Sequence, residues 1–244
     1  IMIILFNYWP MAGCRYAFTK YVIAGPYYVG LKHFVQMFTN DLYFWTAFRN
    51  TLILSIIKLI LNTGAAVIIS LLLNEIVSLG FKKTVQTIVY LPHFMSWVVA
   101  SYFLDAFLNQ DNGLINSILR NAGKEPIQWY MSAGVWPFIL IFMYLWKSTG
   151  YNMVIYLSSI SGIDTTLYEA AVMDGANKRQ QVWHITLPCL KSVIIMMFIL
   201  NVGKVFYSDF GLFFQLSQGA SGSIFKTTAT IDTYVYNALQ SSTP

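Results

Sequence analysis

Long apolar runs, each the length of a membrane-crossing helix, constrain the fold of this chain more than any other feature. A spanning helix needs about 20 predominantly apolar residues. The runs that reach this length are Thr51–Leu73, Val85–Leu108, Val135–Ile160 and Leu190–Phe213. Charged residues make up only 10% of the chain, against about 25% in an ordinary soluble domain. The sequence therefore predicts an all-α, polytopic membrane protein.

The two ends of the chain predict two further spans that are cut short. Ile1–Met11 is apolar but too short to cross a bilayer, so we expect it to be the outer half of a first span. Residues 214–244 are polar and rich in Ser and Thr, so we expect a last span beyond Pro244. The complete protein would then have about six spans, and residues 1–244 would form a single transmembrane domain.

Basic residues in the short loops predict the orientation. Lys82 and Lys83 lie in the loop Ser78–Thr84, and Lys178 and Arg179 lie in the segment 161–187. Because short cytoplasmic loops carry an excess of Lys and Arg, both loops are predicted to be cytoplasmic. The segments 12–50, 109–134 and 214–244 are then predicted to lie outside.

Several classes of function are not supported by any motif. The phosphate-binding pattern G-x-x-x-x-G-K-[ST] is missing, because Gly123-Lys124 and Gly203-Lys204 are followed by Glu and Val. We therefore expect no ATP site, and we assign no catalytic residue. The scattered basic residues form no nucleic-acid-binding face.

Metal and disulfide sites are not predicted either. The three histidines lie in different segments, and each is expected to be structural. Cys14 and Cys189 are far apart in the sequence, so neither a disulfide scaffold nor a Cys-rich metal site is expected.

The polar stretch Tyr168–Pro188, YEAAVMDGANKRQQVWHITLP, interrupts the apolar runs. Its local signals predict a short helix over Leu167–Asp174, started by Asp164 or by a capping box between Thr166 and Glu169. Gly175 is placed for a left-handed cap at the end of this helix. Pro188 suits the first turn of the next helix. These signals alone are equally compatible with an ordinary amphipathic loop helix.

The full spacing in this stretch is more specific. Glu169-Ala170-Ala171, three residues, Gly175, nine residues and then Ile185-x-Leu187-Pro188 resembles the EAA loop of type I ABC importer permeases. The segments 85–101, 167–188 and 231–239 are similar to the carbohydrate branch of that family. Within it they most resemble the Gram-positive permeases for complex oligosaccharides and polysaccharides. The family's N-terminal tail and last span have no counterpart in residues 1–244.

The resemblance implies a role for the loop and a set of partners. The segment 161–187 would be a cytoplasmic loop whose coupling helix docks on an ATPase, through the residues Tyr168, Glu169, Ala170, Ala171, Asp174, Gly175 and Ala176. The permease would sit in the plasma membrane of a Gram-positive bacterium beside a second permease. Two ATPase subunits would bind ATP and Mg, and an extracellular sugar-binding lipoprotein would deliver an oligosaccharide.

Polar residues inside two predicted spans indicate a substrate path. Lys147 and Lys204 are cations within apolar runs, and such charges usually mark a pathway. The fourth span carries a polar face, and so does the fifth. Counted from the motif, the residues that would match the sugar site of maltose-type permeases are Tyr144, Ser148, Tyr151, Asn201, Lys204 and Ser208. Lys147, which lies beside this face of the fourth span, and Asn152 are also expected to bind substrate.

Other roles remain open for several of these residues. Ser148 and Ser208 would serve equally well as hydrogen-bonding contacts between helices. Lys147 and Lys204 would instead pair with acids such as Asp209, or bind an acidic sugar. Lys58 is expected to reach from its span to the membrane surface.

The tryptophans have two possible roles. Trp136 is expected in the aromatic belt at the membrane surface. For Trp97 and Trp146, a belt position and a sugar-stacking role are both open.

Two alternative functions remain. An ion-driven secondary transporter would need an intramembrane carboxylate, for which Asp105 and Asp209 are the candidates. An ABC importer for a non-sugar solute would share the same loop motif. The aromatic and amide residues of the two polar faces favour a sugar.

Overall fold

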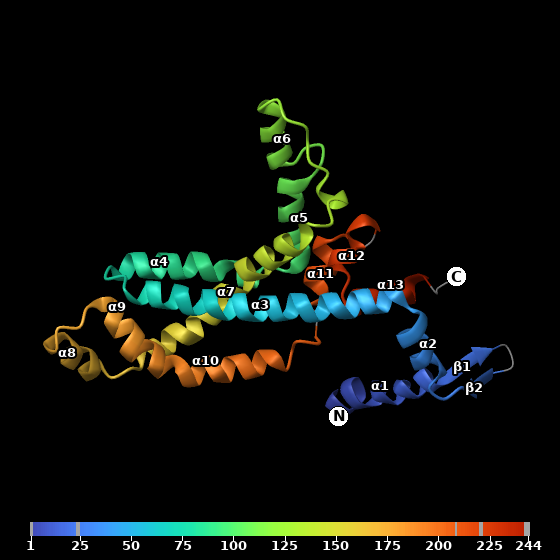
Figure 1. Ribbon diagram of the computed structural model, residues 1–244, viewed down its shortest axis with the longest axis horizontal. Helices are drawn as coiled ribbons and strands as arrows, with labels where there is room; N and C mark the ends of the chain where they lie inside the picture. The colour runs from blue at the N-terminus through green and yellow to red at the C-terminus, as the bar shows by residue number, and fades with distance from the viewer. Residues whose placement is uncertain (1, 23–24, 208, 220–221, 242–244) are drawn as a thin grey trace. The chain divides into compact units, whose positions relative to one another are not determined.

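The computed structural model describes residues 2–22, 25–207, 209–219 and 222–241, and the part described is mostly helical (Figure 1). It divides into two compact units, Ile1–Thr46 and Ala47–Pro244. Among the described residues, three helices are long and apolar enough to cross a membrane, or up to four if one bent pair counts as a span.

The first unit contains a hairpin that the all-α prediction did not include. Its helices are α1 (Trp9–Met11) and α2 (Lys32–Asn40). Between them, β1 (Thr19–Val22) pairs antiparallel with β2 (Gly25–Tyr28), with Thr19 opposite Tyr28. Thr, Tyr and Val favour strands, and Gly25 adopts a φ of +108°, which suits the turn. Residues 4–11 are helical, but their assignment to a first span stays a prediction.

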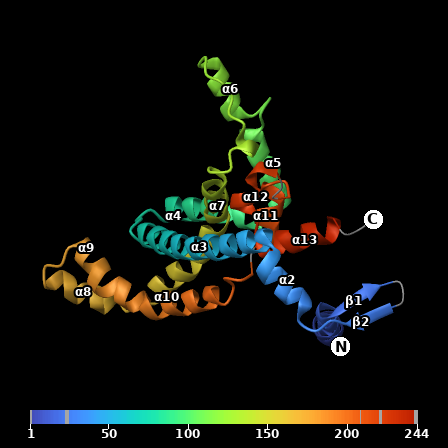
Figure 2. The ribbon, with the colours of Figure 1, turned by 45° about the vertical axis from the view of Figure 1, so that its right-hand side comes forward.

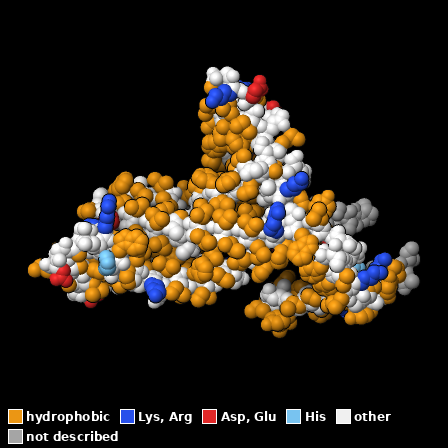
Figure 3. All heavy atoms as spheres, in the orientation of Figure 1, with side chains coloured by type: hydrophobic (Ala, Val, Ile, Leu, Met, Phe, Trp, Pro, Cys, Tyr) orange, Lys and Arg blue, Asp and Glu red, His pale blue; other side chains and the backbone are white. Residues whose placement is uncertain are grey.

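The long helices are α3 (Leu42–Asn74), α7 (Trp136–Ser161) and α10 (Leu187–Val202). α3 and α7 confirm the spans predicted there, although α3 begins nine residues before Thr51. On the face seen in Figure 3, apolar side chains cover most of these helices, and only a few charged side chains interrupt them. This distribution is the one expected of helices surrounded by lipid.

The last predicted span, Leu190–Phe213, is wrong at both ends. The helix runs from Lys178 to Val202, because α9 (Lys178–Gln181) continues through a π-helical turn, Val182–Thr186, into α10. A π turn accommodates a proline such as Pro188, whose ring disturbs the regular hydrogen-bond ladder. The chain then turns after Val202, and a new helix, α11 (Phe210–Leu216), begins with Asp209 as its cap.

The predicted span Val85–Leu108 is two helices rather than one. α4 (Leu79–Tyr90) and α5 (Trp97–Leu108) are bent by 105° at a short break (Figure 2). Pro92 lies in the 3₁₀ turn of the break, and the Ser96 side chain accepts a hydrogen bond from the Val99 N–H at 3.2 Å. A serine in this position starts a new helix.

The remaining helices lie near both ends of α7. Three of them, α6 (Leu114–Asn121), α12 (Phe225–Thr228) and α13 (Ile231–Ser241), lie towards the end where α7 begins. The fourth, α8 (Thr165–Met173), follows the other end of α7. The largest core cluster joins α5, α7 and α11, and Trp136 lies in it with 0% exposure. Its indole N–H donates to the Trp129 carbonyl at 2.9 Å. The belt position predicted for Trp136 is therefore wrong.

Candidate functional site

The start of the loop helix α8 is set by an aspartate. The Asp164 carboxylate accepts a hydrogen bond from the Thr166 N–H at 3.0 Å. Hydrogen bonds from Thr166 hold the pKa of Asp164 below its ordinary value, because they favour the charged carboxylate. Of the two predicted caps, the structure selects Asp164, and the predicted capping box between Thr166 and Glu169 is wrong.

The end of α8 confirms the predicted glycine cap. Gly175 has a φ of +81°. The Ala176 N–H donates to the Ala171 carbonyl at 2.8 Å, and the Gly175 N–H donates to the Val172 carbonyl at 3.0 Å. These paired bonds define a Schellman motif, which ends a helix sharply. The chain therefore leaves α8 in a fixed direction towards α9.

Two side-chain contacts hold α8 and α9 against the rest of their unit. The Tyr168 hydroxyl and the Thr186 hydroxyl lie 2.8 Å apart and share a hydrogen bond. Lys178 pairs with Glu75, just beyond the end of α3, at 3.9 Å. Figures 1 and 2 both show α8 and α9 at the end where α3 turns into α4. The two loops predicted to be cytoplasmic therefore lie at the same end of this unit.

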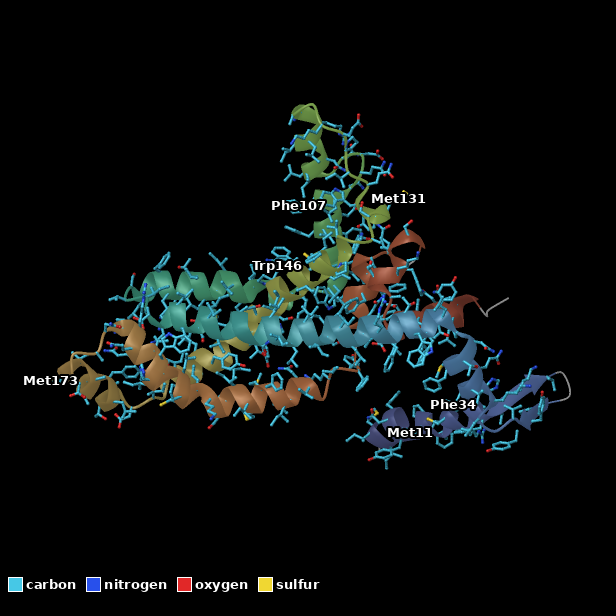
Figure 4. All side chains as sticks on the ribbon, viewed as in Figure 1. Met11, Phe34, Phe107, Met131, Trp146 and Met173 are labelled. Carbon is cyan, nitrogen blue, oxygen red and sulfur yellow. The ribbon has the colours of Figure 1, made fainter. Side chains whose placement is uncertain are left out.

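The outer surface of α8 is unusually apolar for a loop helix. Leu167, Val172 and Met173 are exposed, and 87% of the Met173 surface is accessible. Figure 4 labels Met173 at the extreme of this end. Glu169 and Asp174 are also exposed. Exposed apolar side chains ringed by polar ones are typical of a surface that another protein covers.

A shallow groove runs beside this surface, between α8 and the π turn. Its lining residues are Ala171, Asp174, Gly175, Ala176, Gln180, Gln181, His184 and Ile185. Of the predicted coupling residues, Ala171, Asp174, Gly175 and Ala176 line this groove, whereas Tyr168 faces Thr186 instead. Their contact with an ATPase stays a prediction.

A polar cavity lies inside the second unit, along α3, α7 and the end of α10. Its volume is about 170 Å³. The lining residues are Ser55, Lys58, Leu59, Asn62, Tyr144, Asn201, Lys204, Val205, Tyr207 and Asp209. Polar groups buried between membrane-spanning helices usually mark a substrate path, so this cavity is the candidate substrate site.

Lys58 is the most deeply placed charge in the cavity. Its side chain is only 6% exposed, and its ammonium lies 4.9 Å from the Tyr144 ring centre and 4.8 Å from that of Phe213. Rings at this distance attract a cation. The prediction that Lys58 reaches the membrane surface is wrong, because α3 begins at Leu42 and Lys58 therefore falls in the middle of the helix.

Asp209 forms the acidic wall of the cavity. One of its carboxylate oxygens accepts a hydrogen bond from the Trp97 indole N–H at 2.9 Å. The other accepts from the Leu212 N–H at 3.5 Å, at the start of α11. Trp97 thus has a polar partner inside the fold, which neither role considered for it had predicted.

Only part of the predicted substrate set lines the cavity. Tyr144, Asn201 and Lys204 meet there, whereas Ser148, one turn along α7, is not among the lining residues. Asn152 is not among the lining residues. Ser208 lies outside the described residues.

Lys147 and Tyr151 face the broken span instead. The Lys147 ammonium donates to the His93 carbonyl at 3.0 Å and lies 5.1 Å from the Trp97 ring centre. Tyr151 stacks on His93 with ring centres 4.5 Å apart. Two helical turns separate Tyr151 from Tyr144 by about 10 Å. Tyr144 and Tyr151 share a helix face but therefore do not belong to one site.

The sequence reasoning missed the contribution of α3. Ser55, Lys58 and Asn62 lie at i, i+3 and i+7, the same spacing that singled out α7 and α10. Asn62 is also tied to α7, because its side-chain oxygen accepts a hydrogen bond from Thr149 at 3.2 Å. The sequence contains this pattern, but Lys58 was predicted to lie near a helix end and was therefore not counted as part of a polar face.

Comparison with known proteins identifies the family. Residues 62–238 match the family described as the binding-protein-dependent transport system inner membrane component. The chain belongs to this family. It is therefore a membrane component of a binding-protein-dependent transport system, and the predicted place in the cell membrane is confirmed.

Individual relatives agree with this assignment. The polygalacturonan/rhamnogalacturonan transport system permease protein YteP of Bacillus subtilis (strain 168) is 38% identical over 98% of this chain and 74% of its own length. The lactose transport system permease protein LacF of Rhizobium radiobacter is 31% identical over 81% of this chain and 66% of its own length.

A solved structure shares the fold. A bacterial ABC transporter involved in the import of the acidic polysaccharide alginate matches with a TM-score of 0.88 and 32% identity, over 99% of this chain and 82% of that one. The resemblance to ABC importer permeases of the carbohydrate branch is thus confirmed.

Proposed function

We propose that this chain is a transmembrane subunit of an ATP-driven importer that carries a sugar or oligosaccharide into the cell. The observation that carries the proposal is the polar cavity along α3, α7 and α10, in a unit that also presents an exposed loop helix. Relatives named for pectic polysaccharides and for lactose support a sugar as cargo.

The chemistry of the cavity wall suits a sugar. Tyr144 and Tyr207 offer aromatic faces and hydroxyl groups, and Asn62 and Asn201 offer amides. Aromatic faces pack against the apolar faces of sugar rings, while hydroxyls and amides exchange hydrogen bonds with sugar hydroxyls. The Asn201 amide donates to the Met197 carbonyl at 2.8 Å, which leaves its oxygen able to accept from a ligand.

The size of the cavity indicates that a second subunit completes the path. Its volume of about 170 Å³ is below the roughly 300–1,000 Å³ of ordinary ligand pockets. One sugar unit would occupy it, and the rest of an oligosaccharide would lie against a second permease. An extracellular binding lipoprotein would deliver the sugar. A related alginate transporter, solved with an alginate-loaded periplasmic protein, supports that assembly.

The energy would come from a separate ATPase pair that binds ATP and Mg. We assign no catalytic residue to this chain, and α8 would dock on one ATPase subunit. Closure of the ATPases on ATP would displace α8, and the continuous helix from Lys178 to Val202 would carry that movement to the cavity. Such rigid-body rocking exposes a binding site alternately to the two sides of a membrane.

Uptake into proteoliposomes tests this function. The chain, in its full-length form, would be reconstituted with its partner permease, ATPase and binding protein, and offered neutral and acidic oligosaccharides. We expect saturable uptake of at least one sugar that requires ATP. Intact ATP hydrolysis without sugar uptake would remove the sugar assignment. Uptake that survives ATP depletion but stops with an ionophore would indicate an ion-driven transporter.

A further inference from the structure

We propose that Lys58 and Lys204 form a carboxylate-binding site in the cavity, so that the imported sugar is acidic, such as a uronic acid oligosaccharide. This inference rests on the proposed function, and it names the class of sugar. The names of the relatives do not decide the matter, because they include both a pectic polysaccharide and lactose. The cavity itself supplies the argument.

Lys58 is a buried cation on the wall of the cavity. Its side chain is 6% exposed, and it borders the cavity. A buried ammonium has three N–H donors that need acceptors. Within the described part of the chain, Lys58 contacts the Tyr144 and Phe213 rings but forms no hydrogen bond or ion pair. A charge so far removed from water is costly unless a hydrogen-bonding partner arrives.

The acid on the cavity wall does not take up these donors. Asp209 accepts hydrogen bonds from the Trp97 indole and from the Leu212 backbone. Within the described residues, its carboxylate forms no ion pair with Lys58. The Lys58 ammonium therefore keeps its donors available to a ligand.

The cavity wall carries charged side chains of both signs. Lys58 and Lys204 are the cations on the wall, and Asp209 is the acid. The wall therefore carries a net positive charge. A carboxylate on the ligand would balance that charge and accept hydrogen bonds from the ammonium groups. The same ligand would use Tyr144, Asn62 and Asn201 for its hydroxyl groups.

Direct binding to the purified complex, without the binding protein, tests the inference. A uronic acid oligosaccharide and its methyl ester share the same sugar rings and differ in the charge and one methyl group of each carboxyl, so their dissociation constants report on the carboxylate. We expect the wild-type complex to bind the acid at least about tenfold more tightly than the ester. Lys58→Gln and Lys204→Gln should each weaken binding of the acid by about tenfold and change binding of the ester little.

Matched variants guard against a folding defect. Lys58→Arg keeps the charge and should retain the preference for the acid. Lys191→Gln removes an exposed lysine on α10 that does not line the cavity, and it should change neither constant. Basal ATP hydrolysis and elution volume in detergent report whether each complex is intact.

The possible outcomes separate this inference from the proposed function. Equal binding of acid and ester by the wild type, or equal loss of both in the glutamine variants, would overturn the carboxylate site while leaving a sugar importer. Binding and uptake of neither sugar would overturn the proposed function, and the carboxylate site with it.

Discussion

Replacing Gly150 by valine is expected to prevent the permease from folding into a stable complex. A Cβ atom at Gly150 would lie 2.1 Å from the Val89 carbonyl oxygen and 2.8 Å from the Tyr90 Cα. Both are backbone atoms of α4, so no side chain can move aside, and α4 and α7 would have to separate. Overpacking of a core costs about 1–3 kcal/mol, and a clash with backbone should reach or exceed the upper value. The measurements are the yield and the thermal aggregation temperature of the complex in detergent.

Gly64→Val is the matched control for this prediction. Gly64 also lies inside a long helix, α3, but apart from its own stretch of helix backbone no heavy atom lies within 4 Å of the position of its Cβ. The two variants share the change in helix propensity and differ in the clash. A Gly150→Val complex as stable as the Gly64→Val complex would show that α4 and α7 do not cross this closely.

Replacing Gly175 by valine is expected to reduce ATP-driven uptake to background while the spans stay folded. Gly175 has a φ of +81°, and a residue with a Cβ pays about 1–2 kcal/mol in this region. A helix as short as α8 is marginal by itself, so this cost should unravel its last turn. The exposed surface formed by Val172 and Met173 would then lose its shape. The measurements are uptake, ATP hydrolysis and elution volume of the same preparation.

Gly123→Val is the control, because it introduces the same kind of backbone strain at a position outside α8. Gly123 has a φ of +70°, and a Cβ there would meet nothing within 4 Å. It follows α6, in the segment predicted to lie outside. We expect this variant to keep most of its uptake. If Gly123→Val and Gly175→Val lose uptake equally, or if Gly175→Val transports normally, α8 does not couple ATP hydrolysis to transport.

The features of the fold that depend on local chemistry could be predicted from the sequence. Hydropathy located α3 and α7, because a bilayer-crossing helix must be long and apolar whatever it packs against. The cap at Gly175 followed from the conformational freedom of glycine. Pro188 lies in the first turn of α10, as expected, but the chain enters α10 from α9 through a continuous helix rather than from a loop.

Features that depend on tertiary contacts were not predicted. The break between α4 and α5 has a local sign, Ser96 after Pro92, but the 105° bend also depends on Lys147, which binds the freed His93 carbonyl. Trp136 is buried because Trp129, seven residues earlier, supplies an acceptor for its indole. No periodicity in the sequence reports such a partner.

The residues of the candidate cavity were predicted only in part, because the cavity also depends on tertiary contacts. Periodicity places residues on a helix face, but it does not say which part of that face meets the neighbouring helix. Tyr144 and Tyr151 illustrate this, since one lines the cavity and the other stacks on His93. Lys58 was misjudged through an error of nine residues in the start of α3, which moved it from the middle of a helix to its end.

Cross-linking tests whether α8 connects the transport path to a separate ATPase. Both natural cysteines are first removed by Cys14→Ser and Cys189→Ser. A single cysteine then replaces Met173 on α8. The control variant carries the cysteine at Met131, which is also exposed but lies between α6 and α7. A thiol–amine cross-linker is then added to the purified, transport-competent complex. We expect Met173→Cys to give a permease–ATPase product and Met131→Cys to give none. An intact complex in which Met173→Cys gives no such product, or in which both variants give it equally, would contradict this connection.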